Sequence, residues 1–306
     1  MNKKITISFL IVIIIFALAI FLPNSFSSAE KTLFKVERGE GSKEIANNLK
    51  QAGLIRWAPL FRVYVLTMTI SGDLKAGTYR LSSSMNMPKI AHMLADGKIA
   101  QETITIIEGW NLKDIAWYFE NKGMFQAEEL FELNDNSWQG GLEGYLFPDT
   151  YIVNADESLQ KIINRMKDNF DLKTVGLADK EALTMASLIE KEVRNQEDKE
   201  IVSGILWKRL RAGVPLQVDA TIIYITGKKT SKVSTEDTQV ASDYNTYLHY
   251  GLPPGPIGNP GLESIEAALN PKDSPYWYYL STPEGETIFS QTLQEHNIAK
   301  AKYLSP

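Results

Sequence analysis

The carboxyl side chains best suited to acid–base chemistry lie in residues 186–192, which read Ala-Ser-Leu-Ile-Glu-Lys-Glu. We predict a helix here with Asp179 as its N-cap, and at about 100° per residue it carries an apolar stripe with Glu190 at the margin. The stripe consists of Ala182, Ala186, Ile189 and Val193. A partly desolvated carboxyl keeps its proton more readily, as a general acid near neutral pH must. Helix geometry alone also fits a solvated flank residue. Glu192 points about 200° away from Glu190, so the two should not act as a pair.

A second set of polar side chains follows in residues 215–224. If this segment is extended, Gln217, Asp219 and Thr221 point to one side of it, because successive side chains of a strand alternate. Alternating amide, carboxylate and hydroxyl groups suit the hydroxyl and acetamido groups of sugars. The same pattern fits the wet face of an edge strand, so both interpretations stay open here.

Aromatic and amide side chains precede a segment rich in glycine and proline. Residues 251–261 contain four Gly and four Pro, directly after Tyr244, Asn245 and Tyr247. Because proline fixes φ and glycine permits close backbone approach, this segment is predicted to form a rigid wall of a cleft. The two tyrosines offer faces for sugar stacking, and the Asn245 amide can both donate and accept hydrogen bonds. The alternative is an Ω-like structural loop.

The elements that must carry these residues include an internal repeat with a spacing of 70 residues. Each copy has a β-type run (residues 33–36 and 103–107), a glycine turn, a short amphipathic helix and a glycine at the helix end. The matching positions are Gly39 and Gly109, Ile45 and Ile115, Leu49 and Phe119, and Gly53 and Gly123. Between the copies, residues 75–81 are predicted as a strand and residues 87–94 as a helix started by Pro88. The repeat indicates two βα units of an α+β domain. The alternative is a wall-binding module, because the repeat loosely resembles LysM-like modules, which bind N-acetylated glycans.

The composition describes a folded chain without thiol chemistry. The 306 residues are 44% hydrophobic and 23% charged, which suffices for a core and about two domains. The formal net charge is −5 and no long basic cluster is present, so we expect no nucleic-acid binding. There is no cysteine, and the three histidines lie far apart, so we expect no metal site and no cofactor.

The N-terminus predicts a membrane anchor. Residues 1–4 are basic, and residues 5–22 form an uncharged, mostly apolar run whose helix would span about 27 Å. A cleaved signal peptide is the alternative, because residues 27–29 resemble a cleavage site. The positive-inside rule places residues 1–4 in the cytoplasm and the remaining chain outside it. We predict an anchor at 5–22, a linker at 23–32, the LysM-like module at 33–138 and an α+β catalytic domain at 139–306, within a single-pass protein of the cell membrane.

Five segments in chain order carry a resemblance to a known family. They are residues 143–150, 186–192, 216–219, 244–247 and 251–257. Together they closely resemble the MltG (YceG-like) endolytic murein transglycosylases over nearly the whole chain, and residues 287–290 and 295–297 resemble the closing motif of that family. One departure is Ala220, where the family pattern has proline.

The resemblance implies cleavage of the β-1,4 bond between N-acetylmuramic acid and N-acetylglucosamine without water, leaving a 1,6-anhydro end. It also implies that the first Glu of the Glu-Lys-Glu step, Glu190, is the catalytic acid. Asp219 and Glu143 are predicted helpers. Substrate-binding residues are predicted at Gln217, Asp219, Tyr244, Asn245, Tyr247 and Glu143.

The implied partners are peptidoglycan glycan strands and wall synthases, beside which nascent strands would be terminated. Two other functions stay open. One is a hydrolytic muramidase that uses Glu190 with Asp219. The other is a non-catalytic wall-binding scaffold tethered to the membrane.

Overall fold

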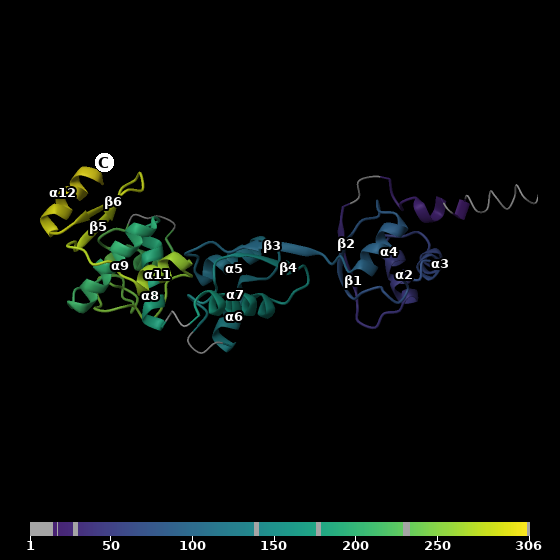
Figure 1. Ribbon diagram of the computed structural model, residues 1–306, viewed down its shortest axis with the longest axis horizontal. Helices are drawn as coiled ribbons and strands as arrows, with labels where there is room; N and C mark the ends of the chain where they lie inside the picture. Colours follow the sequence, from purple (N-terminus) through teal and green to yellow (C-terminus); the bar gives the residue numbers. More distant parts are fainter. Residues whose placement is uncertain are drawn as a thin grey trace, which may run out of the picture. The chain divides into compact units, whose positions relative to one another are not determined.

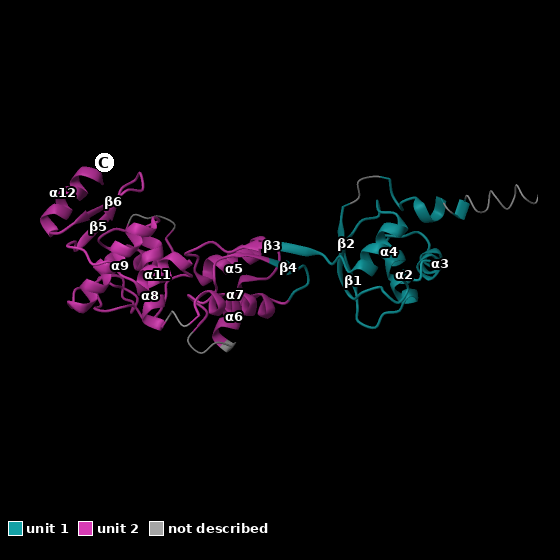
Figure 2. Ribbon diagram, viewed as in Figure 1, with its two compact units in different colours: residues 1–103, 152–157 teal, residues 104–151, 158–306 magenta. Residues whose placement is uncertain are grey.

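The computed structural model describes residues 15–16, 18–26, 30–137, 141–175, 179–228 and 233–304. The chain divides into two compact units, which Figure 2 colours separately. Unit 1 comprises residues 1–103 and 152–157, and unit 2 comprises residues 104–151 and 158–306. Helices and short paired strands alternate in the chain, which confirms the predicted α+β class.

Unit 1 is a small α+β unit built around one antiparallel strand pair (Figure 1). Its elements are β1 (Thr32–Val36), α2 (Ser42–Gln51), α3 (Ala58–Thr67), β2 (Gly77–Leu81) and α4 (Met87–Asp96). Phe34 of β1 lies opposite Tyr79 of β2, and both side chains enter the core. Asn86 caps α4 by accepting a hydrogen bond from the Lys89 amide, and a proline lies in the first turn. The predicted strand and the predicted proline-started helix are therefore confirmed.

The described residues before β1 pack on unit 1. Ile20 is 8% exposed and joins the core of this unit. The Asn24 side-chain amide donates to the Gly53 carbonyl at 2.7 Å, and Arg56 donates back to Asn24. Most of the predicted anchor, residues 5–14 and 17, lies outside the described residues. Within the part that the structure describes, no helix has the length and hydrophobicity needed to cross a bilayer.

The predicted repeat is confirmed in both copies. Strand β3 (Gln101–Thr105) and helix α5 (Leu112–Asn121) match β1 and α2 at the expected spacing. The paired glycines adopt nearly the same left-handed conformations, with φ of +90° and +78° at Gly39 and Gly109 and of +69° and +66° at Gly53 and Gly123. The four predicted core positions of the two helices are buried. The copies fall in different units, however, because unit 2 begins at residue 104 rather than near 139.

Unit 2 carries the remaining elements, and Figure 1 labels most of them. In chain order they are α6 (Ala127–Ser137), β4 (Thr150–Asn154), α7 (Leu159–Lys173), α8 (Lys180–Glu192), α9 (Gln196–Arg211), α10 (Asp219–Thr226), the 3₁₀ turn η1 (Asp237–Gln239), α11 (Leu262–Leu269), β5 (Tyr278–Ser281), β6 (Thr287–Ser290) and α12 (Leu293–Tyr303). β3 pairs with β4, β5 pairs with β6, and the division between the units falls within β3 and β4.

Helix α8 is the central element of unit 2. Asp179 caps it by accepting a hydrogen bond from the Ala182 amide at 2.7 Å, as predicted. Every residue from 182 to 189 is buried, so the apolar surface is wider than the predicted stripe. α8 packs against α9 and α11, which cover it on different sides. Its C-terminal turn, which carries Glu190 and Glu192, is therefore held firmly by the core.

The extended conformation considered for residues 215–224 is not adopted, because residues from Asp219 onward are helical. α10 begins at Asp219, after Gln217 has taken a left-handed conformation with φ of +52°. The Thr221 hydroxyl donates to the Val218 carbonyl and bonds the Thr246 hydroxyl, so it is buried. The hydrogen bond to Val218 lies within the first turn of α10 and gives the Thr221 hydroxyl a partner inside the helix. Gln217, Asp219 and Thr221 therefore do not form one polar face.

Candidate active site

A large cavity in unit 2 has a volume of about 1490 Å³. Its wall brings together residues from α5, α8, α10, β5 and α12, including the side chains of Glu192, Asp219 and Tyr279. A cavity of this size has room for a ligand larger than a typical small metabolite. Of the predicted site residues, Gln217, Asp219 and Tyr247 line this cavity, whereas Glu190, Glu143, Tyr244 and Asn245 are not among its lining residues.

Glu192 is the carboxyl whose protonation the site controls most directly. Burial raises the pKa of Glu192 to about 7, and the negative charge of Asp219 adds to the rise. Hydrogen bonds from the Tyr279 side chain and the Ala220 amide, and the charge of Arg209, partly offset it. The residue keeps partial exposure at the cavity wall. A carboxyl that is still protonated near neutral pH and opens onto a cavity has the properties of a general acid.

The start of α10 organises the surroundings of Glu192. Asp219 is the first residue of α10, and the Tyr247 hydroxyl donates a hydrogen bond to its carboxylate. The next amide, of Ala220, points to Glu192. A negative charge is favourable at a helix N-terminus, and from this position the charge of Asp219 acts on Glu192. The charge of Asp219, a predicted helper, thus acts on Glu192.

Glu190 lies on the other side of α8, in contact with α11. Its Oε2 accepts hydrogen bonds from the Gly261 amide at 2.9 Å and from the Ser264 hydroxyl at 2.7 Å. Its Oε1 lies 3.6 Å from Nζ of Lys199, a lysine that is only 3% exposed and also lies 3.5 Å from Glu263. The carboxylate thus caps the N-terminus of α11 and neutralises a buried lysine. These contacts join Glu190 to Lys199 and to the start of α11, and Glu190 is not among the residues that line the cavity.

Glu108 shows the effect of the charge at Glu190. Burial raises the pKa of Glu108, and the neighbouring Glu190 carboxylate adds to the rise. A side chain at Gly261 would meet the Glu108 carboxyl, because an added Cβ would lie 2.0 Å from Oε1. Two carboxyl groups and Lys199 therefore share a tightly packed pocket at the start of α11, where the absence of a side chain at Gly261 is required.

Glu143 is a clamp between three elements rather than a group exposed to substrate. Both of its oxygens accept from the Leu112 amide, at 3.1 and 3.2 Å, at the start of α5. Tyr224 of α10 donates to it at 3.3 Å, and the Asn259 amide lies at 3.5 Å. Burial raises the pKa of Glu143 to about 7, although these hydrogen bonds offset part of the rise. These hydrogen bonds connect Glu143 to the start of α5, to α10 and to Asn259.

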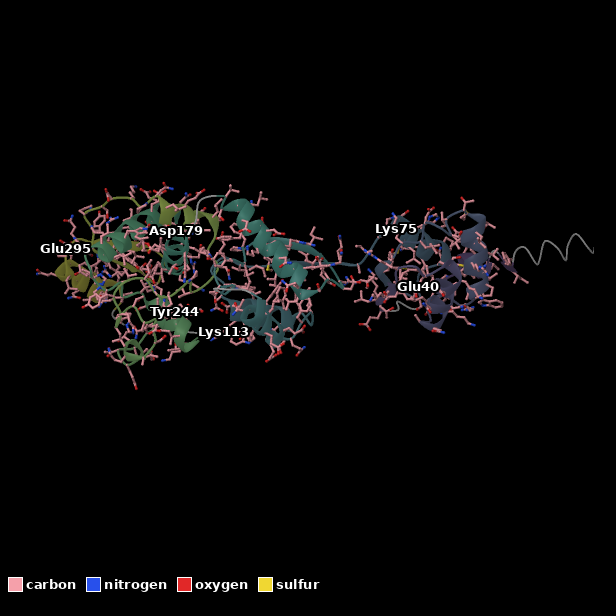
Figure 3. The ribbon with its side chains drawn as sticks, turned by 90° about the horizontal axis from the view of Figure 1, so that it is seen from below. Glu40, Lys75, Lys113, Asp179, Tyr244 and Glu295 are labelled. Atoms are coloured by element: carbon pink, nitrogen blue, oxygen red, sulfur yellow. The ribbon has the colours of Figure 1, made fainter. Side chains whose placement is uncertain are left out.

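Asn245 and Tyr244 are also structural in their contacts. The Asn245 side-chain amide donates to the carbonyls of Thr238 and Val240, and its oxygen accepts from the Tyr247 amide at 2.9 Å. Asn245 is fully buried, so no hydrogen-bonding group is left for a sugar. Tyr244 packs against Tyr224 with ring centroids 5.2 Å apart. In Figure 3, Tyr244 is labelled within unit 2.

The glycine- and proline-rich segment packs beneath the site. The Ile257 amide donates to the Ser187 hydroxyl of α8 at 3.0 Å, and Ile257 lines the cavity. At Gly258, an added Cβ would lie only 2.6 Å from the Gly109 carbonyl oxygen. The Asn259 backbone exchanges hydrogen bonds with the turn before α5. The segment therefore joins α8 to the turn before α5 by close backbone packing. It contributes Ile257 to the cavity wall and also acts as a structural loop.

Several residues of the cavity were not found by sequence reasoning. Arg209 is 7% exposed and donates to the carbonyls of Trp277 and Leu216, which fixes a positive charge behind Glu192. Tyr279 comes from the β5–β6 hairpin near the C-terminus. Neither lies in a motif that indicates chemistry. The only local signal for Glu192 is that the Glu-Lys-Glu step offers two carboxyls on different sides of one helix.

Comparison with known proteins places the chain in a family. Residues 34–302 match the model of the YceG-like family, and the chain belongs to that family. It is 34% identical to the endolytic murein transglycosylase of Bacillus subtilis (strain 168), over 88% of this chain and 84% of that protein. It is 28% identical to the endolytic murein transglycosylase of Streptococcus pneumoniae, over 93% of this chain and 60% of that protein. The crystal structure of a yceG-like protein from Listeria monocytogenes is similar, with a TM-score of 0.61 and 32% identity over 89% of this chain and all of that chain.

Proposed function

We propose that this protein is an endolytic murein transglycosylase that cleaves the β-1,4 bond between N-acetylmuramic acid and N-acetylglucosamine. Membership in the YceG-like family and the names of its relatives support the reaction class. The observation that carries the site assignment is the half-buried Glu192 carboxyl at the wall of the 1490 Å³ cavity, with a pKa raised to about 7.

In the proposed mechanism, Glu192 moves one proton twice. The protonated carboxyl gives its proton to the glycosidic oxygen while the bond from that oxygen to C1 of the muramyl sugar breaks. Positive charge develops at C1. The Glu192 carboxylate then takes the proton of the C6 hydroxyl of the same sugar, and that oxygen bonds to C1. No water is consumed, and the intramolecular attack has a high effective molarity.

The neighbours of Glu192 support both the donation of its proton and the later removal of the C6 hydroxyl proton. Asp219 raises the proton affinity of Glu192 and offers a negative charge near the developing cation. The Ala220 amide and the Tyr279 hydroxyl stabilise the carboxylate once the proton has left. Arg209, behind them, limits how far the pKa rises. Glu192 can thus be protonated before bond cleavage and ionised after it, within the pH range of growth.

A hydrolytic muramidase with Glu192 and Asp219 as its two carboxyls is the second function, because the charge of Asp219 acts on Glu192. The products distinguish the two. Purified sacculi are digested with the full chain in detergent, in water labelled with ¹⁸O, and the muropeptides are weighed by mass spectrometry. We expect 1,6-anhydro ends without label, and their loss in Glu192→Gln. Labelled reducing ends would establish hydrolysis instead, and sacculus binding without turnover in the parent would leave only a wall-binding scaffold.

We also propose that residues 5–22 anchor the chain in the cytoplasmic membrane and that the enzyme terminates nascent strands beside wall synthases. The apolar run and the basic residues before it support the anchor. The test is carbonate extraction of membranes together with protease accessibility of unit 2 from the outer side. Release of the chain into the soluble fraction would contradict the anchor.

A further inference from the structure

One wall of the cavity comes from the second copy of the repeat and not from the motifs on which the predicted site rests. Asn111, Lys113, Asp114 and Trp117 of the α5 region all line the same cavity as Glu192. Lys113, Asp114 and Trp117 are spaced at i, i+1 and i+4, so they share one side of the helix. Figure 3 labels Lys113 in this part of unit 2. None of these residues belongs to a segment from which the site was predicted.

The Trp117 side chain is exposed and does not belong to the core face of α5. The indole is 49% exposed, whereas its neighbours Ile115, Ala116 and Phe119 are buried and form the core face of α5. The first copy of the repeat provides an internal comparison, because the position that corresponds to Trp117 is Asn47, which is also exposed. The helix therefore needs no aromatic side chain there to fold. A large apolar surface kept open on a cavity wall indicates a ligand.

The position of α5 relative to Glu192 is fixed by hydrogen bonds within unit 2. The Gly109 amide donates to the Asn259 carbonyl at 2.7 Å, and the Asn259 amide donates to the Trp110 carbonyl at 2.8 Å. The Leu112 amide donates to the buried Glu143 carboxylate. These contacts hold the first turn of α5 rigidly, as a binding surface requires.

The chemistry of this wall fits a pyranose ring. The axial C–H groups of a β-linked hexopyranose make one apolar face, which the flat indole can cover, while its hydroxyl and acetamido groups need donors and acceptors at the rim. Lys113 supplies a donor. Asp114 uses Oδ2 for the Asn111 amide at 3.0 Å, within the capping box of α5, so its other oxygen can accept.

We propose that Trp117, with Lys113 and Asp114, forms a sugar-binding subsite for a ring of the glycan strand that lies away from the scissile bond. This inference rests on the proposed function, since it assigns a second ring of the same substrate. A subsite that binds a second ring favours strands that extend past the reacting sugar. It therefore gives the endolytic preference a physical origin in binding energy from remote rings.

The test measures binding separately from turnover. Glycan strands freed of stem peptides and sorted by length are titrated against the full chain in detergent, in the Glu192→Gln background. We expect Trp117→Ala to weaken binding of long strands about tenfold, which corresponds to about 1.4 kcal/mol. Trp117→Phe, which keeps an aromatic face, should recover most of the affinity. Trp57→Ala is the matched control, because Trp57 is 54% exposed but lies in unit 1, so it should bind like its background.

Strand length and kinetics give the second readout. In the active chain, Trp117→Ala should raise KM for long strands with little change in kcat, and it should not affect the shortest cleavable oligosaccharide. Equal binding of all lengths by Trp117→Ala and Trp57→Ala would overturn the subsite. An effect present only on strands with intact stem peptides would also overturn it, because the occupant would then be peptide. If the parent releases no anhydro ends, the proposed function fails, yet the titrations still decide whether Trp117 binds sugar.

Discussion

Replacing each carboxyl of the Glu-Lys-Glu step by glutamine should separate a structural carboxylate from a catalytic one. The two variants remove the same group from positions two residues apart on α8, so their chemistry is matched. The structure predicts opposite results for both stability and activity. Glu190→Gln should destabilise unit 2 but retain turnover, and Glu192→Gln should abolish turnover without destabilising the fold.

The loss of stability in Glu190→Gln follows from the buried lysine. Lys199 is 3% exposed and would keep its ion pair with Glu263, whose side chain is 55% exposed, together with the nearby Glu108 carboxyl. Removing one partner of a buried ion pair costs about 3–5 kcal/mol, and the remaining contact places the effect near about 3 kcal/mol. For a unit of this size, this lowers the melting temperature by roughly 6–12 °C. Glu263→Gln, which removes an exposed partner, should cost less than about 1 kcal/mol.

Glu192→Gln should change the free energy of unfolding in the opposite direction. Burial and the charge of Asp219 raise the pKa of Glu192 from 4.5 to about 7, so folding disfavours its ionised form. The contribution of Glu192 to stability therefore falls as the pH rises above about 4.5 and reaches its lowest value above about 7. At 1.36 kcal/mol for each tenfold change, the difference is at most about 3 kcal/mol. Glutamine is neutral throughout, so the variant should be more stable than the parent at about pH 8 and equal to it at about pH 4.

Calorimetry of both variants at these two pH values measures stability, and anhydro-muropeptide release at a temperature well below both transitions measures activity. The reasoning is refuted if Glu190→Gln melts like the parent and yields no anhydro product, because Glu190 would then be the catalytic acid. It is equally refuted if Glu192→Gln retains normal turnover. The Glu263→Gln control shows whether a change at the lysine pocket affects turnover by itself.

Three further predictions follow from named contacts. The rate of the parent should fall as the pH rises through about 7, where Glu192 ionises, and Asp219→Asn should move this fall to lower pH because the charge that raises the pKa is gone; the pH–rate profile measures it. Gly258→Ala should destabilise unit 2 by about 1–3 kcal/mol in thermal unfolding, because its Cβ would lie 2.6 Å from the Gly109 carbonyl oxygen. Asn245→Ala should cost about 1–3 kcal/mol in the same measurement, because it leaves buried carbonyls without donors, while KM at low temperature stays unchanged.

Controls sharpen these predictions. Gly72→Ala places a Cβ in open space and should leave unfolding unchanged, so an equal loss at both glycines would contradict the packing explanation. An unmoved profile in Asp219→Asn would show that Asp219 does not act on the acid. A large rise of KM in Asn245→Ala, without loss of stability, would restore the predicted role of Asn245 in binding substrate.

Local patterns were sufficient where neighbours in sequence are also neighbours in space. The repeat was predicted with its buried positions and its glycine turns, because the helical period and the left-handed conformation at Gly39 and Gly109 are properties of a few adjacent residues. The cap at Asp179 was found for the same reason. The conformation of residues 215–224 was left open by the sequence, because alternation of polar residues also fits a helix whose Thr221 hydroxyl bonds its own first turn.

The sequence by itself determined the α+β class, the repeat, the helix that presents two carboxyls on different sides, and a set of motifs that resemble one family. Only the tertiary structure decided which carboxyl faces the cavity, because proton affinity depends on burial and on charges brought from elsewhere in the chain. Lys199 and the start of α11 contact Glu190, whereas Asp219, Arg209 and Tyr279 act on Glu192. No spacing along the chain encodes those encounters, since they exist only once α8, α9, α10 and the β5–β6 hairpin have packed together.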